Sequence, residues 1–261
     1  MKLHSQIVGQ GQPMIILHGF LGMGDNWRSL ALALAKRNFQ VHLVDQRNHG
    51  RSFHDLEFNY EVLTQDLYNY FQEKDLDRAI VLGHSMGGKT AMAFATQHPE
   101  MVTHLAIADI GPKVYPPHHQ SILKALDHLQ KGKPQSRKGA DALVVEYVQE
   151  PGIRQFLLKN LHWTKDKELA LRLNLNALIE NADQIGAGLD EDAHYSGPTL
   201  FLKGAKSDYL LPEDGPLIAH HFPQASLIEI PGAGHWLHAE NPSDFLQALI
   251  DFLSPTKTRF S

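Results

Sequence analysis

The chain has 261 residues, 43% of them hydrophobic and 20% charged, a globular composition long enough for one large core or two small ones. Its formal net charge of −5 argues against a nucleic acid or an anionic membrane surface as the main partner. It contains no cysteine, which excludes disulfides, cysteine-based zinc sites, iron–sulfur clusters and cysteine nucleophiles.

No apolar run reaches the roughly 18 residues of a membrane span, and the first seven residues lack the basic-then-apolar layout of a secretory signal. A cytoplasmic protein is therefore expected. The first part of the chain alternates short apolar runs with amphipathic helical patterns, which is typical of a parallel sheet covered by helices. The expected buried strands are residues 13–17, 40–45, 79–82 and 105–110.

The pattern changes between residues 112 and 195. Helical periodicity continues there without a convincing buried strand, and prolines and glycines break it at 116–117 and 131–134. Alternation then resumes, with strands expected at 199–202 and 226–230 and an amphipathic helix near the end. We predict an α/β core made of residues 1–111 and 196–261, interrupted by a helical cap of residues 112–195.

A glycine-rich turn at residues 83–90, between a predicted strand and a predicted helix, fits two motifs. It matches the nucleophile elbow G-x-S-x-G, with Ser85 at its apex. It also matches the phosphate loop G-x-x-x-x-G-K-T, with Lys89 and Thr90 in the reactive positions. Asp109, at the end of the next strand, could even serve as the magnesium-binding acid of a nucleotide hydrolase. The turn alone does not decide between an esterase and a nucleotide binder.

Two other segments favour the elbow. A serine nucleophile requires a base, and the oxyanion formed by its attack requires two backbone N–H donors. His235 lies in a small-residue loop after the last strand, where it can act as the base. The first buried strand ends at His18-Gly19, so that the amides of Phe20 and Met86 can be the two donors. The phosphate-loop hypothesis explains neither segment and remains the minor alternative.

The segments 18–22, 45–52, 83–89 and 232–236, in this order, resemble the α/β-hydrolase superfamily. Within it, the chain is similar to the small YbfF-like esterases with a helical cap, over nearly its whole length. The resemblance implies the α/β-hydrolase fold, with a mostly parallel sheet. It also implies hydrolysis of a small acyl ester or thioester without a cofactor.

Two carboxylates are candidates for orienting His235. Many superfamily members place this acid in a G-x-x-D turn, but here Ser207 stands in that place and Asp208 is displaced by one residue. Other branches, haloalkane dehalogenases among them, take the acid from the strand end after the elbow helix, where this chain has Asp109. A carboxylate in so apolar a strand is costly unless it is paired. We predict Asp109 as the acid, with Asp208 as the alternative.

The remaining candidates concern the substrate. Leu21, Trp163 and Trp236 are expected to line an acyl pocket, although Trp163 can equally belong to the cap's own core. The basic stretch 131–138 could meet the phosphates of a coenzyme A thioester, but a solvated loop is the preferred interpretation. The histidines show no metal-ligand spacing, so no metal is expected. A receptor-like hydrolase with slow turnover remains a further alternative, and the sequence does not indicate an oligomeric state.

Overall fold

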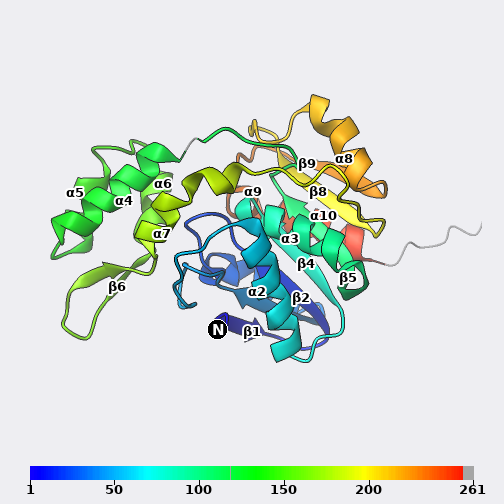
Figure 1. The fold of residues 1–261 in the computed structure, drawn as a ribbon, viewed down its shortest axis with the longest axis horizontal. Helices are drawn as coiled ribbons and strands as arrows, with labels where there is room; N and C mark the ends of the chain where they lie inside the picture. The colour runs from blue at the N-terminus through cyan, green and yellow to red at the C-terminus, as the bar shows by residue number, and fades with distance from the viewer. Residues whose placement is uncertain (118, 255–261) are drawn as a thin grey trace, which may run out of the picture.

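The computed structural model describes residues 1–117 and 119–254 and is built around one seven-stranded sheet (Figure 1). Residue 118 of the predicted cap and residues 255–261 of the predicted core lie outside the described residues. The strands are β1 (Ser5–Val8), β2 (Gln12–Leu17), β3 (Phe39–Val44), β4 (Ala79–His84), β5 (Val102–Ala108), β8 (Thr199–Gly204) and β9 (Ala225–Ile230). Their order across the sheet is β1-β3-β2-β4-β5-β8-β9, with β1 antiparallel to β3 and the other neighbours parallel.

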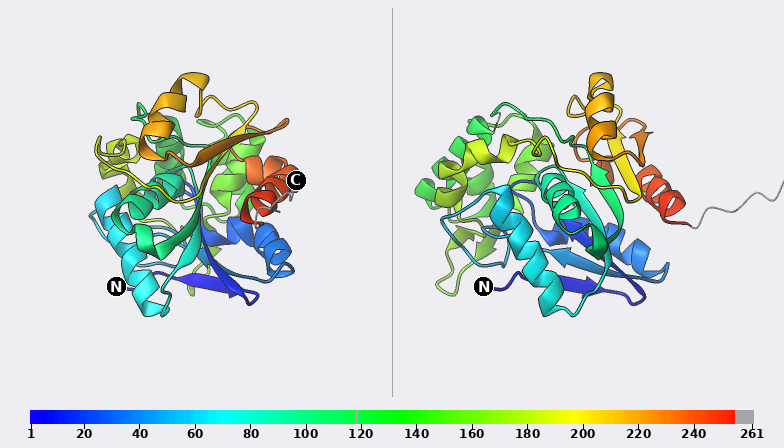
Figure 2. Two further views of the ribbon diagram at one scale, coloured as in Figure 1. Left: turned by 90° about the vertical axis from the view of Figure 1, so that its right-hand side faces the viewer. Right: turned by 45° about the vertical axis from the view of Figure 1, so that its right-hand side comes forward.

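Helices cover both faces of this sheet (Figure 2). The longer ones are α1 (Arg28–Ala35), α2 (Tyr60–Glu73), α3 (Met86–Gln97), α8 (Gly215–His221) and α10 (Pro242–Leu253). Short turns of helix fill the loops: η1 (Gly24–Trp27), η2 (Pro99–Met101), η4 (Pro212–Asp214) and α9 (Leu237–Glu240). The mostly parallel sheet with helices on both sides confirms the predicted fold class.

Strand β2 shows why its sequence is apolar almost throughout. Successive side chains of a strand point to opposite faces. Met14 and Ile16 enter the core formed with α1 and α10, whereas Ile15 and Leu17 enter the core formed with α2 and α3. Because both faces are covered, the strand needs apolar residues at consecutive positions rather than at alternate ones.

We call residues 112–195, between β5 and β8, the cap segment. It contains α4 (Gln120–Gly132), α5 (Arg137–Val144), α6 (Pro151–Leu158), α7 (Leu175–Glu180) and η3 (Ala182–Gly186). It also contains an antiparallel hairpin of β6 (Leu161–Trp163) and β7 (Leu169–Leu171), which the sequence did not predict. Three-residue strands are too short for alternating hydrophobicity to distinguish them from a helical pattern.

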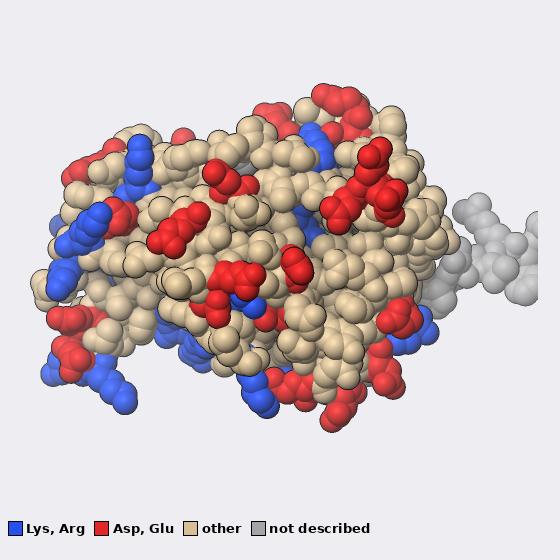
Figure 3. All heavy atoms as spheres, in the orientation of Figure 1, with Lys and Arg blue, Asp and Glu red and all other residues tan. Residues whose placement is uncertain are grey.

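The cap segment lies beside one end of the sheet, and its apolar residues form a core that includes residues of the elbow region (Figure 1). On the face shown in Figure 3, acidic side chains are spread over the middle and right, whereas basic side chains lie mainly at the left and along the lower edge. In the described ranges, no helix combines the length and the apolarity that crossing a membrane requires.

Candidate active site

Ser85 occupies the sharp turn between β4 and α3. Its backbone has φ 52° and ψ −120°, and a positive φ is rare for a residue other than glycine. The turn is held by hydrogen bonds from the Ser85 amide to the Ala108 carbonyl (3.0 Å) and from the Lys89 amide to the Ser85 carbonyl (3.0 Å). This strained strand-to-helix geometry is that of a nucleophile elbow.

The structure pairs His235 with Asp109. His235 Nδ1 lies 2.8 Å from Asp109 Oδ2, although the two residues come from loops 126 positions apart. Asp109 is fully buried at the end of β5, and the Gly204 amide donates to its Oδ1 at 2.9 Å. Asp208 is exposed, and no hydrogen bond or ion pair joins it to His235 among the described residues. Asp109, not Asp208, is thus the carboxylate that can orient the imidazole.

Ser207 and Tyr209 complete the surroundings of this pair, and sequence reasoning assigned a role to neither. The Ser207 hydroxyl donates to Asp109 Oδ2, from the position where a G-x-x-D turn would carry its acid. The Tyr209 ring stacks on His235, with ring centroids 3.9 Å apart and an interplanar angle of 16°. A serine in the acid's usual place was a sequence signal for the contact between Ser207 and Asp109. Nothing in the sequence indicates the stacking of Tyr209 on His235.

The loop at residues 18–22 lies directly against the elbow. A Cβ atom added to Gly19 would stand 2.7 Å from His84 Nδ1 and 3.3 Å from Ser85 Cβ, so the close approach requires glycine. The Leu21 amide donates to His49 Nε2 (3.2 Å), and the Leu21 carbonyl accepts from Asn160 Nδ2 (2.8 Å). These bonds fix the loop from the core on one side and from the cap segment on the other.

The two amides expected to bind an oxyanion belong to this loop and to the start of α3. Neither the Phe20 amide nor the Met86 amide donates to another residue of the described chain. Backbone N–H groups in folded proteins nearly always have partners. Two amides left open next to Ser85 can therefore receive an oxygen of a bound substrate.

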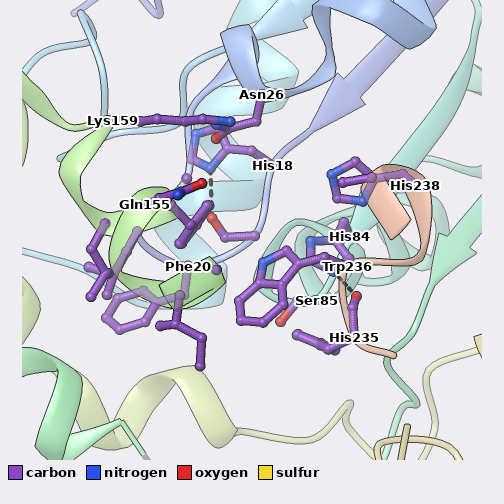
Figure 4. Close-up of a pocket in the computed structure, with 18 of the residues that line it drawn as sticks. His18, Phe20, Asn26, His84, Ser85, Gln155, Lys159, His235, Trp236 and His238 are labelled. Carbon is purple, nitrogen blue, oxygen red and sulfur yellow. Dashed lines mark hydrogen bonds between the residues drawn. The ribbon is translucent and has the colours of Figure 1, made fainter. Parts of the chain in front are cut away.

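A cavity of about 720 Å³ lies beside Ser85 (Figure 4). Ser85, His235 and Phe20 line it, as do two of the three residues predicted for substrate binding, Leu21 and Trp236. The third, Trp163, is 54% exposed on β6 and is not among the lining residues, because the hairpin leaves its side chain in solvent. Ser85 Oγ and His235 share the cavity without a hydrogen bond between them, and catalytic contacts often tighten only when substrate is bound.

The cavity wall is mostly apolar. Its core residues include Trp27, and its cap residues include Ile122, Ile153, Phe156 and Leu157. Polar side chains also line it, including Glu150, Glu240 and several histidines, and three of them, Asn26, Gln155 and Lys159, lie away from Ser85 in Figure 4. Such a cavity, apolar with a few polar groups, is of the kind that holds small organic ligands.

The phosphate-loop alternative does not fit the structure. The Lys89 ammonium is buried and donates to the backbone carbonyls of Lys113 and Ala187, and the Thr90 hydroxyl donates to the Met86 carbonyl at 3.2 Å. Both groups that would hold a phosphate and its magnesium ion are thus bonded inside the protein. Within the described residues, no cluster of three or more histidine, aspartate or glutamate side chains could hold a metal ion.

Buried histidines surround the site. Burial lowers the pKa of His18 to about 4 and the pKa values of His49 and His238 to about 3. Burial also places the pKa of His84 well below 6.5, with the neighbouring imidazoles adding to the shift. All four are therefore neutral at pH 7. A proton on His235 is then not opposed by a neighbouring imidazolium.

A protein-family model, described as the alpha/beta hydrolase fold, matches residues 12–242. The chain belongs to the α/β-hydrolase family. It is 40% identical over 248 residues to a mouse (Mus musculus) protein named sn-1-specific diacylglycerol lipase ABHD11, covering 92% of this chain and 80% of that one. It is 34% identical over 243 residues to the Escherichia coli (strain K12) protein named esterase YbfF, covering 93% of each.

Among solved α/β-hydrolase structures, one titled marine microorganism esterase superposes with a TM-score of 0.93 at 41% sequence identity. The match covers 97% of this chain and 99% of that one. The similarity to a YbfF-like α/β hydrolase, expected from the four sequence segments, is confirmed by these relatives.

The buried histidines predict a loss of stability in acid. Each has a folded pKa below its unfolded value of about 6.5, so it contributes stability that is present above pH 6.5 and is lost as the pH falls toward the folded pKa. Within that window, one such histidine lowers the free energy of unfolding by up to about 1.4 kcal/mol per pH unit. Urea titrations between pH 6.5 and 4 are expected to show this steep fall.

The contribution of one histidine is measured by replacing His238, which stacks on Trp27, and comparing the variant with a matched change of the exposed His220. His238→Gln should reduce the slope of unfolding free energy against pH by about 1 kcal/mol per unit, whereas His220→Gln should leave it unchanged. Equal slopes in the wild type and His238→Gln would contradict the argument.

Proposed function

We propose that this α/β hydrolase is a serine esterase that cleaves carboxylic (acyl) esters through an acyl-enzyme formed on Ser85. The observation that carries the proposal is the 2.8 Å pair of the buried Asp109 with His235, which lines the same cavity as Ser85. Two relatives in the comparison carry the names lipase and esterase, which supports an ester as the bond attacked.

In the proposed reaction, Ser85 Oγ attacks the acyl carbonyl carbon while His235 Nε2 takes the hydroxyl proton. The carbonyl oxygen becomes an oxyanion and binds the Phe20 and Met86 amides. His235 then gives its proton to the oxygen of the leaving alcohol, and the ester bond breaks. A water molecule, deprotonated by His235, attacks the acyl-enzyme, and collapse of the second oxyanion returns the proton to Ser85 and releases the acid.

Asp109 has an orienting role in this scheme. Its Oδ2 accepts from His235 Nδ1, which leaves Nε2 as the proton-accepting nitrogen. Donors from Gly204 and Ser207 hold the carboxylate, and the stacked Tyr209 ring restricts the plane of the imidazole. The histidine is thus held in one tautomer and one orientation before the substrate arrives.

The apolar cavity suits an acyl chain of several carbons, and the structure offers less to a coenzyme A thioester. The basic stretch 131–138 does not line the cavity. Within that stretch, the Arg137 guanidinium donates to the Leu158 and Leu161 carbonyls (both 3.0 Å), and Lys131 pairs with Asp127. We therefore propose that the substrates are simple esters. We also propose that the enzyme works in the cytoplasm.

The nucleophile is tested by labelling with a fluorophosphonate and mapping the modified peptide. The label is expected on Ser85, and Ser85→Ala should remove both the label and the hydrolysis of p-nitrophenyl butyrate, because no other hydroxyl lies at the elbow. A label on another residue would refute the assignment. Stoichiometric labelling without multiple turnover would favour the receptor-like alternative.

The acid is tested by a matched pair of substitutions. Asp109→Asn should lower kcat by about 10⁴-fold. With the asparagine oxygen facing the Gly204 amide, its NH2 group donates to His235 Nδ1, and the imidazole adopts the wrong tautomer. Asp208→Asn should change kcat little, because Asp208 is exposed and the described residues show His235 paired with Asp109 instead. Circular dichroism checks that both variants are folded. Loss of activity in Asp208→Asn alone would transfer the role to that residue.

The substrate class is tested with p-nitrophenyl esters from acetate to octanoate. Burying one methylene in an apolar cavity is worth about 0.8 kcal/mol, so kcat/KM should rise by roughly fourfold for each added methylene until the cavity is filled. Ile153→Trp puts a larger side chain on the cap side of the cavity, so the highest kcat/KM should move to an ester with a shorter acyl chain. A flat profile in the wild type would argue against an acyl-binding cavity.

A further inference from the structure

Lys89 is a buried lysine that the proposed chemistry does not use. It lies in α3, one helical turn after Ser85, and only 2% of its surface is exposed. Its Nζ donates to the Ala187 carbonyl at 2.6 Å and to the Lys113 carbonyl, and it lies 5.0 Å from the centroid of the Tyr115 ring. Burying an ammonium is costly, so a position where this cost is accepted needs an explanation.

The two carbonyls belong to the first and the last stretch of the cap segment, which we call its two connections. Lys113 stands in the connection that follows β5, and Ala187 stands in the connection that leads back toward β8. The segments also bond to each other, through the Tyr115 amide to the Gly186 carbonyl (2.8 Å) and the Leu189 amide to the Pro112 carbonyl (2.9 Å). Lys89 therefore contacts both connections where they run side by side.

The closeness of the two connections is built into the sequence. A Cβ atom added to Gly186 would stand 2.1 Å from the Tyr115 carbonyl oxygen, so this contact admits no larger residue without displacement. An ammonium has three N–H donors, and charge-assisted hydrogen bonds to carbonyls are stronger than neutral ones. One side chain from the elbow helix can thus hold both connections.

A second lysine, Lys113, lies near the same aromatic ring as Lys89. The Lys113 ammonium lies 5.2 Å from the Tyr115 ring centroid and pairs with Asp214 at 2.7 Å. Burial lowers the pKa of Lys89 to about 7, and the Lys113 ammonium adds to the shift. Lys89 is therefore not a solvated surface charge, and its bonds to the two carbonyls are its polar contacts.

A chain of contacts leads from Lys89 to the candidate base. The Tyr115 hydroxyl donates to the Tyr209 carbonyl at 2.6 Å and accepts from the Gly111 amide at 2.8 Å. Tyr209 in turn stacks on His235. The ring beneath the Lys89 ammonium is thus bonded to the residue that restricts the imidazole.

We propose that Lys89 is a positioning residue that fastens both connections of the cap segment to the elbow helix and so sets the distance between the cap wall and Ser85. The proposal rests on the proposed esterase function. Ile122, Ile153 and Phe156 line the cap side of the cavity. We expect a long acyl chain to reach this wall, whereas an acetyl group extends only about two carbons from Ser85. Lys89 consequently affects kcat/KM for long-chain esters more than kcat/KM for short-chain esters.

The test compares kcat/KM for p-nitrophenyl octanoate and acetate in the wild type and in K89M, which keeps the side-chain length and removes the donors. The octanoate-to-acetate ratio should fall by about tenfold or more in K89M, since small displacements of a binding wall have large effects on rate. K89R, which restores the charge and the donors, should recover most of the ratio. K113M, which removes a cation beside Tyr115 but keeps the carbonyl, should leave the ratio unchanged.

An equal fall for both esters in K89M, with the ratio intact, would mean that Lys89 only stabilises the fold and would overturn the proposal. A ratio altered as much in K113M as in K89M would overturn it too. If K89M does not fold, G186A displaces the same connections without touching Lys89 and should lower the same ratio; an unchanged ratio there would count against the proposal.

Hydrogen exchange separates this proposal from the proposed function. The Tyr115 and Leu189 amides, which bond across the two connections, should exchange faster in K89M than in the wild type and K113M. Unchanged exchange would overturn the positioning role. If the wild type hydrolyses neither ester, the proposed function fails, and hydrogen exchange still decides the role of Lys89.

Discussion

The structure of the site depends on one buried carboxylate. Asp109 ends a strand in the middle of the sheet, where an ionised group needs several donors. Its partners are the Gly204 amide at the end of β8, the Ser207 hydroxyl in the loop after β8 and the His235 imidazole in the loop after β9. Satisfying that carboxylate therefore brings distant parts of the chain to the edge of the sheet where the Ser85 elbow also lies.

Neutral histidines surround this convergence. Four histidines near the cavity are kept neutral by burial, and three of them bond to the backbone: His18 accepts from the Gln46 amide, His49 accepts from the Leu21 amide, and His84 bonds to the His235 carbonyl. Neutral imidazoles can fix loops without competing for the proton that a base must take up. The loss of stability expected in acid is the consequence of using several such groups.

Much of the fold and of the site follows from the sequence, because short motifs with local backbone requirements carry it. Strand–turn patterns in the sequence predict three features of the site: the elbow around Ser85, the loop at residues 18–22 and the loop that carries His235. No such local pattern distinguishes Asp109 from Asp208 as the orienting acid, because that choice depends on where Ser207 lies in three dimensions. The β6–β7 hairpin and the exposure of Trp163 depend on packing within the cap segment, which no periodicity encodes. Lys89 matched a phosphate-loop pattern in the sequence. Its contacts with two distant backbone carbonyls favour the nucleophile elbow over the phosphate loop.

The cap segment also forms hydrogen bonds with the loop at residues 18–22 and with the loop that follows β3. Asn160, fully buried after α6, donates to the Leu21 carbonyl, and the Asn174 amide donates to the Asn48 carbonyl at 3.0 Å. The same segment that supplies the apolar wall of the cavity thus supports the loop that presents the Phe20 amide. In the proposed function, a change in how this segment sits on the core would alter the space for the acyl chain and the position of the Phe20 amide together. The proposal therefore couples selectivity to rate through the attachments of one segment.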